Sequence, residues 1–218
     1  MPNKFDLLVF DWDGTLMDSA AHIASALQAA FRDLGLPVPS REAARHVIGL
    51  GLEDAMTYLN PGMQRHRYQE VAERYRVHFL AGDADVELFP LVSEGILSLN
   101  QEGFLMAVAT GKSRRGLDRS LNATGLTAYF HASRCADEGF PKPHPDMLQV
   151  IMQTLGAEAQ RTLMIGDTTH DLQMAQNAGV AAVGVCYGAH SHGNLQSMNP
   201  LACLNSFEHL MQWLKQNG

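Results

Sequence analysis

The sequence predicts an α/β fold in which a doubly wound parallel sheet carries a small all-helical insert after its first strand. Two observations support this prediction. Short apolar runs alternate with segments of helical periodicity from about residue 90 onward, as expected where helices connect parallel strands. The stretch from about residue 19 to residue 81 shows helical signals only, so we expect it to stand apart from the sheet.

Four apolar runs have the length of strands and are apolar on both faces. They are residues 7–10, 105–109, 163–165 and 180–185. A strand that is apolar on both faces is typical of a parallel sheet covered by helices on both sides. We therefore expect a Rossmann-like core.

Helical spacing of apolar residues predicts the helices between these strands. In the sheet-forming part of the chain they span residues 93–101, 114–124, 145–155 and 171–178. Pro145 suits an early helical position, and Gly156 and Gly179 fall where two of these helices should end.

The helical insert should contain four helices. They are residues 21–34, a second helix capped by Ser40, residues 53–59 and residues 64–80, with 45–52 as a loop. This assigns residues 1–17 and 84–218 to the sheet domain and residues 18–83 to the insert, with the return near Gly82 and Asp83.

The composition excludes several classes of protein. The net charge is −7 and no Lys/Arg run occurs, so we expect no nucleic-acid partner. No apolar run is long enough to span a membrane. Three widely spaced cysteines, Cys135, Cys186 and Cys203, are typical of reduced thiols and predict a cytoplasmic location. The sequence is compatible with a monomer or a homodimer.

Two acids follow the first strand in the stretch LLVFDWDGT. Asp11 comes directly after the apolar run, and Asp13 follows two positions later. In a doubly wound sheet, ligands bind beyond the carboxyl ends of the strands. Taken alone, the pair also fits an ordinary Asp-rich turn.

Further polar residues follow the other strands. Thr110 and Gly111 end the second run and open a helix, where backbone N–H groups favour a phosphate. Lys142 lies between two prolines that stiffen its loop. Asp167 and Asp171 follow the strand at 163–165.

Four carboxylates on one rim predict a bound cation. Clustered acids repel one another unless a positive charge neutralises them. Hard oxygen ligands with open positions suit Mg²⁺. A carboxylate can also attack phosphorus and form an aspartyl-phosphate, while the lysine and backbone N–H groups stabilise the transferred group.

These residues resemble the four motifs of the haloacid dehalogenase-like (HAD) superfamily, in the same order. The motifs are Asp11-Trp12-Asp13-Gly14-Thr15, Thr110, Lys142 and Gly166-Asp167 with Asp171. The resemblance covers essentially the whole chain, and the helical insert resembles a cap of this superfamily. The most similar branch is that of the phosphoglycolate phosphatase-like and β-phosphoglucomutase-like enzymes.

The resemblance implies a role for each motif residue. Asp11 would be the nucleophile, and Asp13 the general acid/base whose backbone carbonyl also reaches the metal. Thr110 and Lys142 would hold the phosphoryl group. Asp167 would bind Mg²⁺ directly, and Asp171 would either bind it through water or hold Lys142.

The sequence thus predicts a phosphoric monoester hydrolase that is Mg²⁺-dependent and acts on a small phosphate ester, such as a phosphoglycolate-like compound or a sugar phosphate. Alternatives are a phosphomutase, an inorganic pyrophosphatase, a non-catalytic binding module and a dehalogenase. Dehalogenases of this superfamily lack an acid at the position of Asp13, since a halide leaving group needs no proton.

Two weaker features concern loops. Arg45 and His46 in the insert are candidates for binding an anionic substrate. The His190-Ser191-His192 sequence resembles a metal-binding pair, but no further ligand lies at a useful spacing. We interpret it as a glycine-flanked loop that borders the site.

Overall fold

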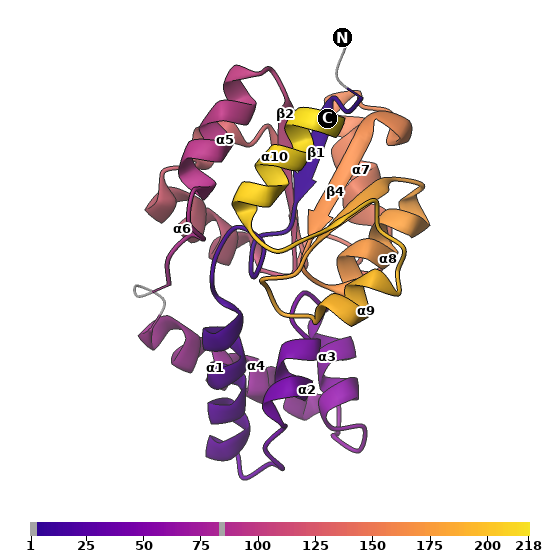
Figure 1. Cartoon of the computed structure of the whole chain (residues 1–218). Coiled ribbons are helices and arrows are strands. Elements are labelled where there is room, and N and C mark those ends of the chain that lie inside the picture. Colours follow the sequence, from indigo (N-terminus) through magenta and orange to yellow (C-terminus); the bar gives the residue numbers. More distant parts are fainter. Residues whose placement is uncertain (1–3, 83–85) are drawn as a thin grey trace.

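The computed structural model describes residues 4–82 and 86–218 (Figure 1). Six strands in these ranges form one parallel sheet with the order β3-β2-β1-β4-β5-β6. The strands are β1 (Leu7–Phe10), β2 (Leu105–Thr110), β3 (Ala132–Cys135), β4 (Thr162–Gly166), β5 (Ala181–Val185) and β6 (Cys203–Leu204). The predicted α/β fold is confirmed, because all four predicted strands lie in this sheet.

The two strands at the sheet edges were not predicted. In β3 only the last of four residues is buried, and β6 consists of two half-buried residues. An edge strand has a neighbour on one side only, so it needs no continuous apolar run. The sequence signal on which the prediction depends is therefore weak at both edges.

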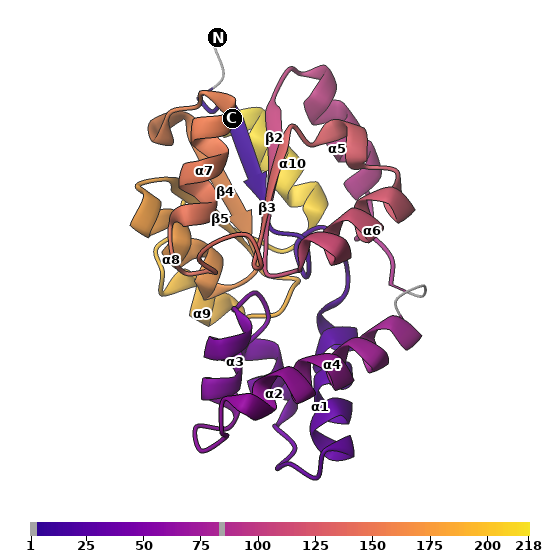
Figure 2. The ribbon, with the colours of Figure 1, turned by 180° about the vertical axis from the view of Figure 1, so that it is seen from behind.

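Helices cover both faces of the sheet (Figures 1 and 2). Leu8 and Phe10 of β1 pack on one face against α5, α6 and α10, while Leu7 and Val9 pack on the other against α7 and α8. This alternation follows from the two-residue period of a strand. The helices are α5 (Val92–Gln101), α6 (Arg114–Thr124), α7 (Asp146–Leu155), α8 (Thr169–Ala178), α9 (His192–Gln196) and α10 (Phe207–Asn217).

The ends of the core helices follow local capping. Gly156 and Gly179 end α7 and α8 in the left-handed conformation, with φ of 65° and 68°, as predicted. Thr168 caps α8 through a reciprocal pair of hydrogen bonds with Asp171. The short helix α9 and the C-terminal helix α10 had not been predicted.

Four further helices form the helical insert, α1 (Ala20–Asp33), α2 (Arg41–His46), α3 (Leu52–Leu59) and α4 (His66–Ala81). The Ser40 hydroxyl accepts the Ala43 N–H at 3.0 Å, so Ser40 caps α2 as expected. The loop predicted at 45–52 is shorter, because its first two residues end α2. The expected return at 83–84 lies outside the described residues.

The helical insert lies beyond the carboxyl ends of the strands (Figures 1 and 2). It has its own apolar core, in which Phe31 of α1, Ala44 of α2, Met56 of α3 and Val71 of α4 pack together. The strand ends that carry the predicted site therefore face a second packed unit.

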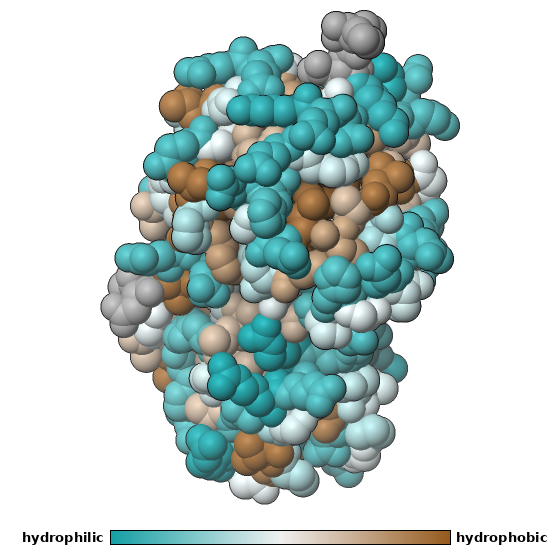
Figure 3. Space-filling model, viewed as in Figure 1, coloured by the Kyte–Doolittle hydropathy of each residue, from teal (hydrophilic) through white to brown (hydrophobic). Residues whose placement is uncertain are grey.

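The face shown in Figure 3 is mainly hydrophilic, with hydrophobic residues in separate small patches. None of the described helices has both the length and the apolar character needed to cross a bilayer.

Candidate active site

The predicted motif residues come together at the carboxyl end of the sheet. Asp11 follows β1, and Thr110 ends β2. Asp167 follows β4, and β1 pairs directly with both β2 and β4. Lys142 reaches the same place from the loop after β3, where its ammonium is buried against Asp11.

Lys142 links two of the acids. Its Nζ atom lies 2.7 Å from Asp11 Oδ1 and 2.6 Å from Asp171 Oδ1, and its side chain is fully buried. Burial works against the charge of the ammonium, but the two carboxylates raise the pKa of Lys142 above its ordinary value. The lysine therefore stays charged beside Asp11.

Asp167 is held rigidly by two donors. The Thr15 hydroxyl donates to its Oδ1 at 2.9 Å, and the Ala189 N–H donates to its Oδ2 at 2.6 Å. Burial and then the charge of Asp11 raise the pKa of Asp167 well above its usual range. Burial likewise raises the pKa of Asp11 to about 7, although Lys142 opposes the shift.

The three acids fit a divalent metal. Asp11, Asp167 and Asp171 each offer an oxygen within 4.8 Å of the others. Asp11 Oδ2 is buried and has no hydrogen-bond partner among the described residues. Burial disfavours the charged forms of Asp11 and Asp167, and a bound cation would offset that cost. Carboxylate oxygens are the hard donors that Mg²⁺ prefers.

Asp13 has a different environment from these acids. Its Oδ1 accepts the Ser19 hydroxyl at 2.7 Å and lies 2.9 Å from Lys112 Nζ. Lys112 also lies over the ring of Phe79 in α4, at 4.7 Å from its centroid. Sequence reasoning did not single out Lys112, whose one signal was its place directly after Thr110 and Gly111.

Gly111 lies against the helical insert. A Cβ atom built on it would lie 2.9 Å from the Cα of Gly49. The backbones of the two loops therefore touch, which only glycine allows at such a separation. Leu50 forms an isolated bridge with Lys142 beside this contact.

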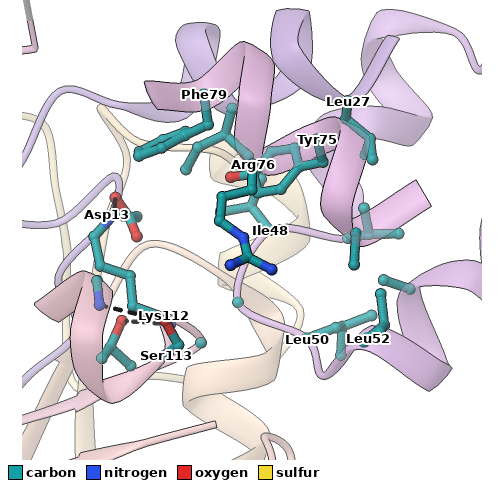
Figure 4. A pocket seen from close by; sticks show the side chains of 18 of the residues that line it. Asp13, Leu27, Ile48, Leu50, Leu52, Tyr75, Arg76, Phe79, Lys112 and Ser113 are labelled. Carbon is teal, nitrogen blue, oxygen red and sulfur yellow. Dashed lines mark hydrogen bonds and ion pairs between the residues drawn. The ribbon is translucent and has the colours of Figure 1, made fainter. Parts of the chain in front are cut away.

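A cavity of about 770 Å³ opens between the insert and the sheet (Figure 4). Asp11, Asp13, Thr110, Gly111 and Lys112 line its end at the sheet. The carboxyl groups at the ends of β1 and the loop after β2 thus face a space large enough for an organic ligand.

Arg45 and His46 do not line this cavity, in contrast to their expected role in binding substrate. The Arg45 guanidinium donates to the carbonyls of Gly188 and Ala189. The His46 carbonyl accepts hydrogen bonds instead, and its ring stacks on that of His190 at 5.1 Å. The structure therefore places both residues in a contact between the insert and the sheet-side loop at 187–190.

That loop was expected to be a glycine-flanked border of the site. It contacts Asp167 through the Ala189 N–H, and Ala189 and His190 are buried. His190 is 5% exposed and accepts the Thr169 N–H at its Nδ1, so its Nε2–H donates to the His46 carbonyl at 3.0 Å. Burial lowers the pKa of His190 to about 4. His170 donates to the same carbonyl at 2.8 Å. His192 lies in α9, and among the described residues it belongs to no cluster of side chains that could hold a metal ion.

Comparison with known proteins shows the family of the chain. The family model for haloacid dehalogenase-like hydrolases matches residues 8–185. The chain belongs to the haloacid dehalogenase-like hydrolase family. Among its relatives in this family, "Probable phosphatase IndB" of Dickeya dadantii is 40% identical, with 94% of this chain and 91% of the relative covered.

A second relative in the haloacid dehalogenase-like family is the phosphoglycolate phosphatase of Vibrio parahaemolyticus, 32% identical over 94% of each chain. These relatives confirm the predicted phosphoglycolate phosphatase-like branch and a phosphoric monoester hydrolase. The fold is also that of a solved hydrolase from Pseudomonas syringae, with a TM-score of 0.89, 21% identity and coverage of 96% of this chain and 97% of that one.

Proposed function

We propose that the protein is a Mg²⁺-dependent phosphatase that hydrolyses a small phosphorylated metabolite through an aspartyl-phosphate on Asp11. One observation carries the proposal. Asp11 both lines the cavity and lies 2.7 Å from the buried ammonium of Lys142. A carboxylate next to an open cavity and a fixed positive charge is suited to attack a phosphoryl group.

The reaction has two chemical steps. Asp11 attacks phosphorus, the bond from phosphorus to the leaving oxygen breaks, and Asp13 gives that oxygen a proton. Asp13 then takes a proton from a water molecule, whose oxygen attacks phosphorus and releases phosphate from Asp11. Thr110, Gly111 and Lys142 hold the phosphoryl oxygens.

Asp11 and Asp167 would bind Mg²⁺ directly, and the backbone carbonyl of Asp13 would complete the protein ligands. The bound cation would neutralise charge on the phosphoryl group during transfer. The 2.6 Å ion pair between Asp171 and Lys142 favours the second of the two roles expected for Asp171, that of holding the lysine.

The helical insert, residues 18–83, would act as a cap domain over a core formed by residues 1–17 and 84–218. Opening and closing of such a cap admits the substrate and then excludes bulk water. The substrate would be a phosphoglycolate-like compound or a sugar phosphate in the cytoplasm. A phosphomutase is distinguished by its product, because it would convert a sugar 1-phosphate into an isomer without releasing phosphate.

The nucleophile is tested with Asp11→Asn. We expect phosphate release from a generic phosphate ester to fall by ~10⁴-fold or more, since an amide is a poor nucleophile. The exposed Asp18 provides the matched control, and Asp18→Asn should retain activity. Circular dichroism establishes that both variants fold. Wild-type turnover by Asp11→Asn would contradict the proposal.

The metal is tested by chelation. EDTA should abolish turnover, and excess Mg²⁺ should restore it. Asp167→Asn should raise the Mg²⁺ concentration needed for half-maximal activity by ~10-fold or more. Full activity in EDTA would contradict the metal requirement.

A further inference from the structure

The cavity next to Asp11 is larger than a phosphate group requires. Its volume of about 770 Å³ lies within the range of pockets that enclose whole organic ligands. Only the end at the sheet contains the acids and the loop after β2. The remainder of the cavity is therefore available to the part of the substrate that leaves with the oxygen.

The walls of this remainder are apolar. They come from the loop after α2 and from α1, α3 and α4, and Ile48 and Phe79 among them are 4% and 6% exposed. Figure 4 shows Leu27, Leu50 and Leu52 on the side away from Asp13. Leu50 and Leu52 are only half-buried and Leu80 is exposed. A small polar leaving group would leave these three side chains in contact with water, whereas an apolar one would bury them.

Arg76 of α4 projects into the cavity (Figure 4). Figure 4 shows the Arg76 guanidinium between Lys112 at the reacting end and Leu50 at the apolar end. Arg76 lines the cavity, and it has no hydrogen-bond or ion-pair partner among the described residues. Its charge is thus free to meet a ligand.

Three other cations line the cavity from the sheet side, Lys112 in the loop after β2 and Arg115 and Arg119 in α6. Among the described residues, Arg76 is the cation that the helical insert contributes to this cavity. Lys142 pairs with Asp11 and Asp171, and Lys112 pairs with Asp13. Arg76 is therefore not required to neutralise the catalytic acids. In a chain of net charge −7, an unpaired arginine above an apolar wall is suited to select an anion there.

We propose that the substrate is a phosphate monoester whose organic part has an apolar body and carries a second anionic group, which Arg76 binds. This inference rests on the proposed function, because it takes Asp11 as the end that holds the phosphate. It replaces the glycolate or sugar leaving group considered above with one that has an apolar body, because the cavity walls contributed by the insert are apolar. The apolar walls bind the body, and Arg76 orients it by its charged end.

The substrate preference is tested with three esters of primary alcohols, so that the leaving groups are equally reactive. They are ethyl phosphate, hexyl phosphate and 6-phosphooxyhexanoate. We expect kcat/KM to rise ~10-fold from ethyl to hexyl phosphate as the chain is buried. A further ~10-fold rise is expected for the carboxylated ester.

The role of Arg76 is tested with Arg76→Met, which keeps most of the side-chain volume. The preference for 6-phosphooxyhexanoate over hexyl phosphate should fall from ~10-fold to ~1, through a higher KM for the carboxylated ester. Arg74 lies on the same helix and pairs with Asp33, so Arg74→Met is the control and should keep the preference.

Two results would overturn the inference while the phosphatase stands. Equal turnover of ethyl and hexyl phosphate would exclude binding of an apolar body. If Arg76→Met lowered kcat/KM equally for hexyl phosphate and 6-phosphooxyhexanoate, Arg76 would attract the phosphate common to both and would not recognise a second anion. Calorimetry with hexylphosphonate and 6-phosphonohexanoate measures the same preferences as binding constants. If no ester were turned over, the proposed function would be rejected, and the calorimetry would still test this inference.

Discussion

Asp13 and Asp11 are two residues apart in the sequence but have different partners in the fold. Asp11 pairs with Lys142, which is buried, while Asp13 accepts the Ser19 hydroxyl and pairs with Lys112. Both residues line the cavity, but their neighbours differ, because Asp11 lies close to Asp167 and Asp171 and Asp13 does not belong to that group. This difference supports different roles for the two acids in phosphoryl transfer.

Lys112 should act as a positioning residue for Asp13. We expect Lys112→Met to lower kcat for an alkyl phosphate by about tenfold, because Asp13 would no longer be held beside the leaving oxygen. An aryl phosphate, whose leaving group needs little help from a proton, should be less affected. Steady-state kinetics with the two esters measure the difference.

Lys112→Arg keeps the charge and should recover part of the loss for the alkyl phosphate. The positioning role would be contradicted if Lys112→Met lowered kcat equally for both esters. Equal losses would mean that Lys112 contributes to binding of the phosphoryl group common to both.

At the scale of elements, an arginine ties α6 to the edge of the sheet. Arg114 at the start of α6 donates to both carboxylate oxygens of Glu138 at 2.9 Å and to the Ser133 hydroxyl at 2.9 Å. Glu138 also accepts the Cys135 N–H at 2.8 Å. The pair therefore stabilises the short edge strand β3 and the loop that leads to Lys142.

The stability of this connection should depend on pH. The hydrogen bond from Arg114 lowers the pKa of Glu138, so the folded state favours the carboxylate. Its contribution is present above the unfolded pKa of about 4.3 and is lost as pH falls through the lower folded pKa. Glu138→Gln should cost about 1–2 kcal/mol at neutral pH and progressively less in acid.

Urea unfolding of the wild type and Glu138→Gln, from neutral pH down to the acid range, measures this dependence. The exposed Glu73 provides the control, because Glu73→Gln should leave the free energy of unfolding nearly unchanged at every pH. A difference between wild type and Glu138→Gln that stays constant with pH would contradict the interpretation.

At the scale of the whole molecule, one contact joins the helical insert to the loop that holds Asp167. Arg45 donates to the carbonyls of Gly188 and Ala189, and the Ala189 N–H donates to Asp167. His190 donates to the His46 carbonyl next to it. Two consecutive hydrogen bonds thus link the insert to Asp167, one of the acids that we propose to bind the metal.

Loss of this contact should loosen the insert from the sheet. In Arg45→Met we expect amide hydrogen exchange in residues 187–190 to rise by ~10-fold, because their carbonyls lose the guanidinium. Exchange in the central strands should not change. Arg41, which is exposed on the same helix, supplies the control variant Arg41→Met. Unchanged exchange in Arg45→Met would show that the contact does not hold the two parts together.

The sequence by itself determined the main elements and the convergence of the motif residues. Asp11, Thr110 and Asp167 each follow an apolar run, and the carboxyl ends of parallel strands meet at one edge of a sheet. The local sequence pattern was therefore sufficient to predict that these residues lie at the same edge of the sheet. The helix ends at Gly156 and Gly179 were equally predictable, since a left-handed cap is a local property of the chain.

Only the tertiary structure decided which side chains pair across long separations. Arg45 contacts Gly188 across 143 residues, and no periodicity or motif links two such positions. The same holds for Arg76, whose place in the cavity depends on how α4 packs against α1 and α3 and on where the insert lies relative to the strand ends. Periodicity and motifs report interactions between residues near in sequence, whereas the cavity and its partners arise when separate elements pack together.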